Sequence, residues 1–154
     1  MGIRDIPIPS YKYCLSSMVL GRRIYDKIGL DVVRYYPKEV CGVLLGSISG
    51  TTGYVKSYVR LKTLEVLDRK FWFDENEWMS AIINGRKRGL EYIGIVHSHP
   101  NRSAVPSIED LERMIECPGE VWLILSYDGS RIEYTAWSVC GYDLMTRRLD
   151  VIIN

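Results

Sequence analysis

Gly94-Ile95-Val96-His97-Ser98-His99-Pro100 is the stretch that says most about this chain. Its two histidines are the only ones among the 154 residues, and they follow an apolar run, Tyr92 to Val96, that is typical of a buried strand. Side chains two apart on a strand point to the same face, so both imidazoles are expected to leave the strand end together. Pro100 cannot donate to a sheet ladder, and the strand is therefore predicted to end there.

A carboxylate lies at a spacing that can reach these imidazoles. Seven residues separate His99 from Ser107, and two more separate Ser107 from Asp110. The stretch from Ser107 to Asp110 fits a helix capping box, so a loop is expected to turn back and place Asp110 on the first turn of a helix. Two imidazoles and one carboxylate suit zinc, and three protein ligands leave the fourth tetrahedral position for water. We therefore predict one Zn²⁺ per chain, bound by His97, His99 and Asp110.

Each part of this pattern has an ordinary alternative. Two histidines two apart can be a solvated strand end, and Ser107 to Asp110 can be a helix cap alone. Neither alternative explains why every histidine of the chain lies close to that cap. Other metal hydrolases fit less well, because a TIM barrel needs roughly 250 residues and the His-Glu-x-x-His pattern of the zincins is absent.

The whole arrangement resembles the JAMM (MPN-plus) metalloprotease motif. That family also has an acidic residue upstream, before a Cys-Gly and a run of aliphatic residues, and the matching stretch is Glu39-Val40-Cys41-Gly42. The resemblance runs from about Leu20 to about Leu125. It fills all five functional positions, which are Glu39, His97, His99, Ser107 and Asp110.

The resemblance implies both a fold and an activity. The fold is α/β, a three-layer-like sandwich of a mixed sheet with about three helices, in the layout shared with cytidine deaminases, although the deaminase pattern itself is absent. The implied activity is that of a zinc metalloprotease. Glu39 is the candidate base and proton shuttle, and Ser107 is the candidate hydrogen-bond donor to the oxyanion. Cys41 is two residues from Glu39 and is interpreted as a buried spectator thiol, with zinc capture as the alternative.

The chain lacks the long insertions of eukaryotic family members, so it resembles the compact archaeal and bacterial ones. This favours an isopeptidase that cleaves after the C-terminal Gly-Gly of a ubiquitin-like modifier, as in deubiquitinases and desampylases. One alternative is a peptidase that processes the C-terminus of a sulfur-carrier protein, which would use the same five residues. The other is a scaffold module without catalysis, which retention of the five residues counts against. The oligomeric state stays open.

Composition limits the other possibilities. The length fits a single domain over 1–154, in which 1–10, with Pro7 and Pro9, is expected to be loose. The net charge is +1 with both signs interspersed, so neither a nucleic-acid nor a membrane partner is expected. No secretory signal and no run of transmembrane length is present, and the expectation is a soluble, cytoplasmic protein.

The four cysteines, Cys14, Cys41, Cys117 and Cys140, form no Cys-x-x-Cys pair, so a structural zinc knuckle is not expected. Buried thiols are the simplest interpretation in a reducing cytosol. The chain has no glutamine and few asparagines, which hints at a thermophilic source and leaves intracellular disulfides open.

Hydrophobic periodicity gives the order of elements. Helices are predicted over 17–36, from the capping residue Asp74 to about 85–89, and over 107–116. Strands are predicted over 11–14, 40–48, 54–64, 71–73, 92–98, 121–127, 131–139 and 143–153, with the last at a sheet edge.

Overall fold

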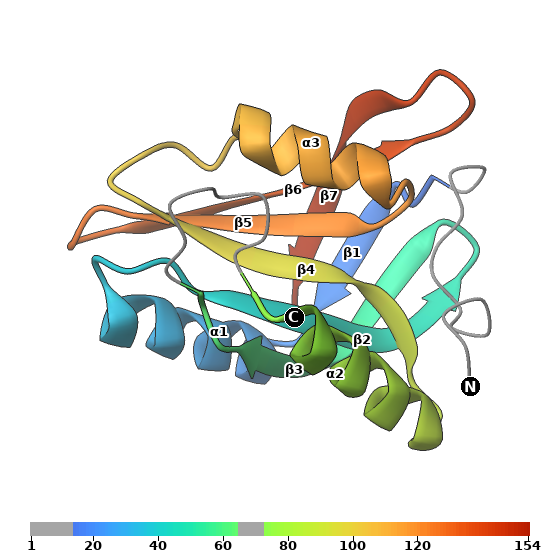
Figure 1. The fold of residues 1–154 in the computed structure, drawn as a ribbon, viewed down its shortest axis with the longest axis horizontal. Coiled ribbons are helices and arrows are strands. Elements are labelled where there is room, and N and C mark those ends of the chain that lie inside the picture. Colours follow the sequence, from blue (N-terminus) through green and yellow to red (C-terminus); the bar gives the residue numbers. More distant parts are fainter. Residues whose placement is uncertain (1–13, 65–72) are drawn as a thin grey trace.

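The computed structural model describes residues 14–64 and 73–154, and Figure 1 shows their course. This part of the chain forms three helices and seven strands. In chain order they are β1 (Ser17–Leu20), α1 (Arg22–Tyr35), β2 (Cys41–Ser49), β3 (Thr52–Leu61), α2 (Glu75–Lys87), β4 (Glu91–Pro100), α3 (Ile108–Glu116), β5 (Val121–Tyr127), β6 (Ile132–Cys140) and β7 (Met145–Ile153).

The strands form one mixed sheet that closes into a barrel in the order β1-β3-β2-β4-β5-β6-β7. β4 pairs antiparallel with β2 and parallel with β5, so the strand that carries both histidines has a neighbour on each side. Residues 92–99 are all buried. A strand covered on both faces needs a near-continuous apolar run, which 92–96 supplies. The expected mixed α/β architecture with three helices is confirmed.

The helices cover both faces of the sheet. α1 contributes Ile28 and Val32 to one apolar cluster, whereas α2 contributes Trp78 and Ile82 to the other, which α3 joins through Met114. In Figure 1, α3 lies above β5 and α1 lies on the opposite side of the sheet. This packing fixes the start of α3 relative to β4, the two elements that the metal prediction requires to meet.

The first predicted helix was too long at its start. Residues Ser17 to Leu20 form β1, which pairs with β3 and with β7, and the helix begins only at Arg22. Met18 and Leu20 are fully buried while Ser17 and Val19 are only half-buried. That alternation has the period of a strand, but four residues are too few to separate it from the helical pattern that follows.

The last strand is not at an edge, contrary to the prediction. β7 pairs antiparallel with β6 through 145–149 and parallel with β1 through 150–153. Its two halves therefore serve two different neighbours, and this closes the sheet. The partner that covers β7 is β1, the segment that the periodicity assigned to a helix, so one error caused the other.

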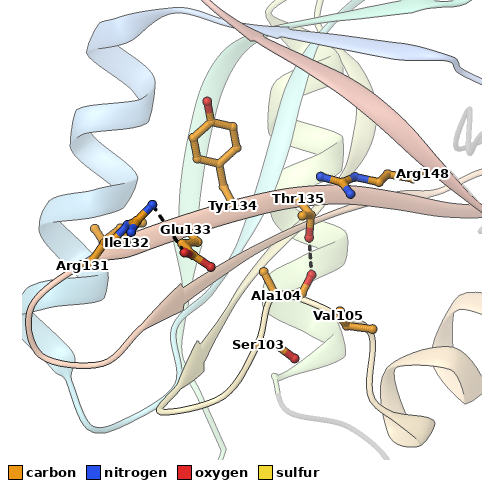
Figure 2. Close-up of a pocket in the computed structure, with 9 residues that line it drawn as sticks. All are labelled: Ser103, Ala104, Val105, Arg131, Ile132, Glu133, Tyr134, Thr135 and Arg148. Carbon is orange, nitrogen blue, oxygen red and sulfur yellow. Dashed lines mark hydrogen bonds and ion pairs between the residues drawn. The ribbon is translucent and has the colours of Figure 1, made fainter.

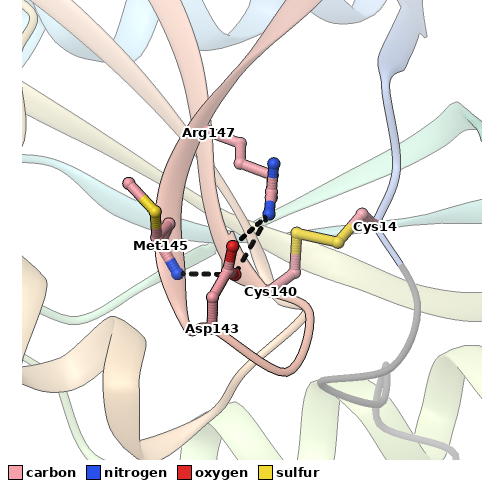
Figure 3. The surroundings of a disulfide bond; sticks show 5 residues. All are labelled: Cys14, Cys140, Asp143, Met145 and Arg147. Carbon is pink, nitrogen blue, oxygen red and sulfur yellow. Dashed lines mark hydrogen bonds and ion pairs between the residues drawn. A yellow bond between two sulfur atoms is a disulfide. The ribbon is translucent and has the colours of Figure 1, made fainter.

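Two cysteines are joined rather than free. Cys14 and Cys140 form a disulfide, with their Cα atoms 5.4 Å apart and their positions 126 apart in sequence. Figure 3 shows the bond beside the turn between β6 and β7, where Asp143 accepts hydrogen bonds from Arg147. Cys41 and Cys117 are free thiols. The simplest interpretation, free thiols, therefore holds for Cys41 and Cys117, while Cys14 and Cys140 form a disulfide of the kind that the sequence left open.

Some predictions fall outside the described residues or differ in detail. Three predicted segments lie wholly or mostly outside the described residues, namely the loose segment 1–10, the strand over 11–14 and the strand over 71–73. Of their described residues, Cys14 is not in a strand, and Phe73 forms an isolated bridge with Thr63. Asp74 caps α2 by accepting from the backbone N–H of Asn76, as predicted. A capping box of Asp74 with Glu77, which the sequence also suggested, is not formed, because the Glu77 carboxylate accepts from the backbone N–H of Lys62. None of the helices in the described ranges is long and apolar enough to cross a membrane.

Candidate metal centre

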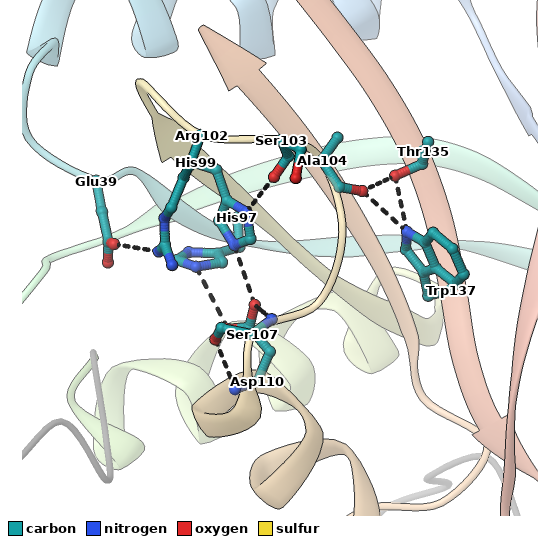
Figure 4. A network of polar contacts seen from close by, with 10 residues as sticks. All are labelled: Glu39, His97, His99, Arg102, Ser103, Ala104, Ser107, Asp110, Thr135 and Trp137. Carbon is teal, nitrogen blue, oxygen red and sulfur yellow. Dashed lines mark hydrogen bonds and ion pairs between the residues drawn. The ribbon is translucent and has the colours of Figure 1, made fainter.

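The three predicted ligands come together at the carboxyl end of β4. Nε2 of His99 lies 3.0 Å from Oδ2 of Asp110, and Nε2 of His97 lies 3.5 Å from Oδ1 of the same carboxylate. All three side chains are buried. Figure 4 shows the two imidazoles descending from the strand towards Asp110 on the first turn of α3. Each carboxylate oxygen thus faces one imidazole.

The hydrogen bond on the far side of His99 fixes which nitrogen faces Asp110. Nδ1 of His99 lies 2.8 Å from the carbonyl oxygen of Ser103. A carbonyl only accepts, so Nδ1 carries the hydrogen and Nε2 of a neutral imidazole holds a lone pair. That lone pair faces an ionised carboxylate oxygen at 3.0 Å. Two acceptor atoms at this distance repel each other unless a proton or a metal ion lies between them. A hydrogen bond from Nδ1–H to a carbonyl is typical of metal-binding histidines.

The donor set fits a divalent cation. Oδ1 of Asp110 is buried and makes no hydrogen bond within the described ranges. A buried, ionised carboxylate oxygen without a hydrogen-bond donor or a cation lowers the stability of the folded protein. The three ligand atoms lie within 4.8 Å of one another, and zinc bonds of about 2.0–2.1 Å place neighbouring ligands roughly 3.3 Å apart. Two imidazoles and a carboxylate are also the ligand types of open zinc sites.

Burial prepares both kinds of ligand. Burial lowers the pKa of His97, against the opposing charge of Asp110, so its imidazole is neutral at physiological pH. Burial acts to raise the pKa of Asp110, but its contact with His99, the neighbouring His97 and the hydrogen bond from the Ser107 backbone outweigh it, and the pKa lies below its usual range. Neutral imidazoles and an ionised carboxylate are the protonation states that bind metal.

The predicted capping box is present and orients Asp110. The Ser107 hydroxyl accepts from the Asp110 backbone N–H at 3.1 Å, and the Ser107 backbone N–H donates to Oδ2 of Asp110 at 2.8 Å. The same carboxylate therefore caps its helix and faces the imidazoles. Ser107 itself is half-buried, and its hydroxyl hydrogen is not used by the cap, because the oxygen accepts there.

Glu39 lies at the edge of this cluster, on the segment that leads into β2. Its backbone carbonyl accepts from the Thr63 hydroxyl at 3.0 Å, and Oε1 of its side chain lies 2.8 Å from Nη2 of Arg102. The side chain is 16% exposed, in contrast to the buried ligands. Figure 4 shows its carboxylate paired with Arg102 at one end of the group that contains the two imidazoles.

Cys41 lies directly opposite His97 in the pairing of β2 with β4. Its thiol is fully buried in the apolar cluster beneath α2, and burial raises its pKa far above the usual range, so the thiol stays protonated. The group of side chains in the described ranges that could hold a metal consists of His97, His99 and Asp110, without Cys41. This favours the interpretation of Cys41 as a spectator.

A buried polar network beside His97 was not predicted. Glu120 accepts hydrogen bonds from Tyr92 and from Nε1 of Trp122, and its Oε2 lies 3.9 Å from the guanidinium of Arg113. Burial raises the pKa of Glu120, while Arg113 opposes that effect. The ring of Trp122 packs edge-on against His97, with 6.1 Å between centroids. The network therefore supports one wall of the cluster.

A groove borders the other side of the loop that follows β4. The Ala104 carbonyl accepts from the Thr135 hydroxyl and, at 3.1 Å, from Nε1 of Trp137, which fastens the loop to β6. The groove has a volume of about 460 Å³, and Figure 2 shows Arg131 and Glu133 on one wall. Its residues are Ser103, Ala104, Val105, Arg131, Ile132, Glu133, Tyr134, Thr135 and Arg148.

Known proteins resemble this chain over most of its length. Residues 21–140 match the family described as prokaryotic homologs of the JAB domain. A protein of Haloferax volcanii named desampylase is 36% identical over 94 residues, which are 60% of this chain and 66% of the relative. The match thus spans just under two thirds of that relative.

Solved structures agree in fold. A protein of Desulfitobacterium hafniense is 25% identical with a TM-score of 0.76, covering 89% of this chain and 92% of the other. A protein of Salinibacter ruber is 27% identical with a TM-score of 0.66, covering 89% and 91%. A JAB1/MPN domain protein of Archaeoglobus fulgidus, at 20% identity and a TM-score of 0.54, covers 88% and 98% and shares the fold. With the family match over 21–140, the chain belongs to the prokaryotic JAB-domain family.

Proposed function

We propose that this protein is a zinc-dependent isopeptidase that cleaves after the C-terminal Gly-Gly of a ubiquitin-like modifier. The observation that carries the proposal is the buried carboxylate of Asp110, whose two oxygens each face one histidine Nε2. The similarity to a protein named desampylase supports a modifier as substrate. The desampylase match and the cluster together favour hydrolysis over a purely structural role.

His97, His99 and Asp110 are proposed to hold the zinc ion. When bound, this ion supplies Lewis-acid activation of water and of the scissile carbonyl at neutral pH. The Ser103 carbonyl holds the tautomer of His99 that presents Nε2, and the cap at Ser107 holds the carboxylate of Asp110. These contacts hold the ligand atoms in the positions that face the proposed ion.

Glu39 is proposed as the general base. It takes the proton of the attacking water and passes it to the leaving amine, a role worth roughly 10²–10⁴-fold in rate. Its partly exposed carboxylate suits this role, because the proton must reach a leaving group at the edge of the cluster. Its backbone is fixed through Thr63, so the carboxylate moves only by rotation of its own side chain.

Ser107 is proposed to stabilise the oxyanion. Its oxygen accepts from the Asp110 backbone, which leaves the hydroxyl hydrogen to donate to the developing negative charge. One such donor is worth roughly 3 kcal/mol of transition-state stabilisation. Its position at the start of α3 adds the favourable end of the helix dipole.

The Gly-Gly tail is proposed as the recognised part of the substrate. Residues without side chains can approach a backbone closely in an extended conformation. The proposed partner is therefore a ubiquitin-like or sulfur-carrier protein with such a tail. A bulky residue in place of its last glycine should suppress cleavage.

The test uses a ubiquitin-like protein that ends in Gly-Gly, joined by an isopeptide bond to a lysine of a reporter peptide. The purified chain should release the reporter, and a zinc chelator should stop the reaction. Asp110→Asn should be inactive, whereas Glu109→Gln, which removes the exposed neighbouring carboxylate, should be active. Cleavage that resists the chelator, or equal rates in both variants, contradicts the proposal. Cleavage confined to a linear C-terminal extension would instead indicate a processing peptidase.

A further inference from the structure

An ion pair joins the candidate base to the loop that follows the metal strand. Oε1 of Glu39 lies 2.8 Å from Nη2 of Arg102, three residues after His99, and Figure 4 shows the guanidinium between the two segments. The spacing of the metal ligands does not require an arginine at this position. The contact therefore needs an explanation of its own.

The backbones on either side of this pair are already fixed. The backbone N–H of Val40 donates to the Ser98 hydroxyl at 2.7 Å, and the backbone N–H of Ser98 donates to the Val40 carbonyl at 2.9 Å. The Tyr36 hydroxyl donates to the side-chain oxygen of Asn101 at 2.7 Å. Asn101, in the left-handed region at φ 59°, also donates its N–H to the Tyr127 carbonyl. Arg102 follows directly on this anchored residue.

We infer that Arg102 is a positioning residue, which holds the carboxylate of Glu39 at the edge of the metal cluster. This inference rests on the proposed function, in which Glu39 is the base. With the backbone fixed, the remaining freedom of Glu39 lies in its side-chain torsions, and the ion pair restricts them. Positioning matters because a displacement of about 1 Å can cost about 10²-fold in rate.

The chemistry of the two groups fits positioning. A guanidinium keeps its proton at all relevant pH values, so Arg102 does not compete for the proton that Glu39 transfers. A carboxylate has two oxygens, and engagement of Oε1 is compatible with proton uptake at Oε2. The side chains are 39% and 16% exposed, so solvent screens the pair and it adds little to stability. Its expected effect is on the rate rather than on folding.

The test compares Arg102→Ala and Arg102→Lys in the wild-type and Glu39→Gln backgrounds. Arg102→Ala should lower kcat by about 10–10²-fold, with KM changed less than about twofold and zinc content unchanged, and Arg102→Lys should recover part of the loss. In the Glu39→Gln background, where the base is gone, Arg102→Ala should change the residual rate less than about twofold, measured in single turnover. Arg147→Ala is the control, because Arg147 forms an arginine–carboxylate pair of similar length with Asp143, 2.9 Å long, in a more exposed turn.

A second readout does not depend on activity. With ¹⁵N-labelled arginine, the side-chain resonance of Arg102 should move in Glu39→Gln and stay in place in Arg147→Ala. Four results would each overturn the inference but leave the proposed function intact. They are an unmoved Arg102 resonance, an unchanged or raised kcat in Arg102→Ala, loss of zinc from that variant, and an equal loss of rate in the Glu39→Gln background. A wild-type chain that binds zinc and cleaves no conjugate would overturn the inference together with the proposed function.

Discussion

Single residues at the cluster are prepared by burial and by their hydrogen bonds. Burial holds the pKa of His97 below its usual range, and the Ser103 carbonyl selects the tautomer of His99. The Asp110 carboxylate is oriented by the start of its own helix. Different residues are expected to serve metal binding and proton transfer, because the metal ligands are buried and Glu39 is not.

The first prediction is that a change at Glu39 affects catalysis without affecting metal binding. Glu39→Gln keeps the shape of the side chain but cannot take up a proton. The variant should fold, retain one zinc per chain and lose about 10²-fold or more in turnover. Zinc content and single-turnover rate should be measured on the same preparation. Loss of zinc would make Glu39 a ligand, and full activity would place the base elsewhere.

The second prediction concerns pH. The pKa of His97 in the folded chain lies below its ordinary value of 6.5, so below that pH the unfolded chain binds more protons than the folded one. The free energy of unfolding of the chelator-treated protein should therefore fall as pH falls through 6.5. The lowered pKa of Asp110 acts with the same sign below its ordinary value of 3.8. Urea unfolding at about pH 7.5 and 5.5 measures the slope.

His97→Asn is the control for this slope. Asparagine does not titrate, so the dependence of unfolding on pH between these values should be smaller in the variant. An identical slope in both proteins would assign the effect to other groups.

The contacts that could be predicted from the sequence join residues close together in the chain, and those that could not join residues far apart in it. The ligand pattern is local, since His97 to Asp110 spans one strand end, one loop and one helix start, and a short chain segment dictates that geometry. The ion pairs of Glu39 with Arg102 and of Glu120 with Arg113 depend on the fold, and no sequence spacing predicts them. A carbonyl partner for His99 could have been expected from metal chemistry, but not its identity.

At the scale of elements, β4 is the strand on which the site depends. Its central position requires close approach to β5, and a Cβ at Gly94 would lie 1.9 Å from the Val121 carbonyl oxygen. β4 and α2 were predictable from their apolar patterns, and α3 was predictable from the capping box at its start. β1 was not, because its alternation covers only four residues and runs into the helix.

The third prediction follows from Gly94. Gly94→Ala should push β4 away from β5 and lower the free energy of unfolding by about 3 kcal/mol. It should also weaken zinc retention, because His97 lies three residues further along the same strand. Gly21→Ala is the control, since a Cβ there has no neighbour within 4 Å. Chemical unfolding of the two variants decides the matter, and equal stability would contradict the packing described for β4.

At the scale of the whole molecule, two long-range contacts complete the fold. β7 closes the sheet by pairing with β1, and the disulfide joins the beginning of the described chain to the end of β6. Neither could be predicted from the sequence, because cysteine spacing does not reveal pairing, and a strand with two neighbours looks like an edge strand when one of those neighbours is assigned to a helix.

The fourth prediction concerns the disulfide. A crosslink between residues 126 apart restricts the unfolded chain strongly, so Cys14→Ser should lower the free energy of unfolding by about 4 kcal/mol. Dithiothreitol should lower the stability of the wild type to the same level and leave Cys14→Ser unchanged. Zinc content should be retained in the folded variant, because the bond lies outside the cluster. A wild type unaffected by reduction would contradict the pairing.

The most direct test of the account is the metal content of the protein. Elemental analysis of protein purified without chelator should find one zinc per chain, because three buried ligands converge within 4.8 Å and one carboxylate oxygen there needs a cation. His97→Ala and Asp110→Ala should each lose the metal, whereas Glu109→Gln should keep it. Wild-type protein that contains no zinc and takes up none on addition would contradict the assignment of the cluster and the proposed activity with it.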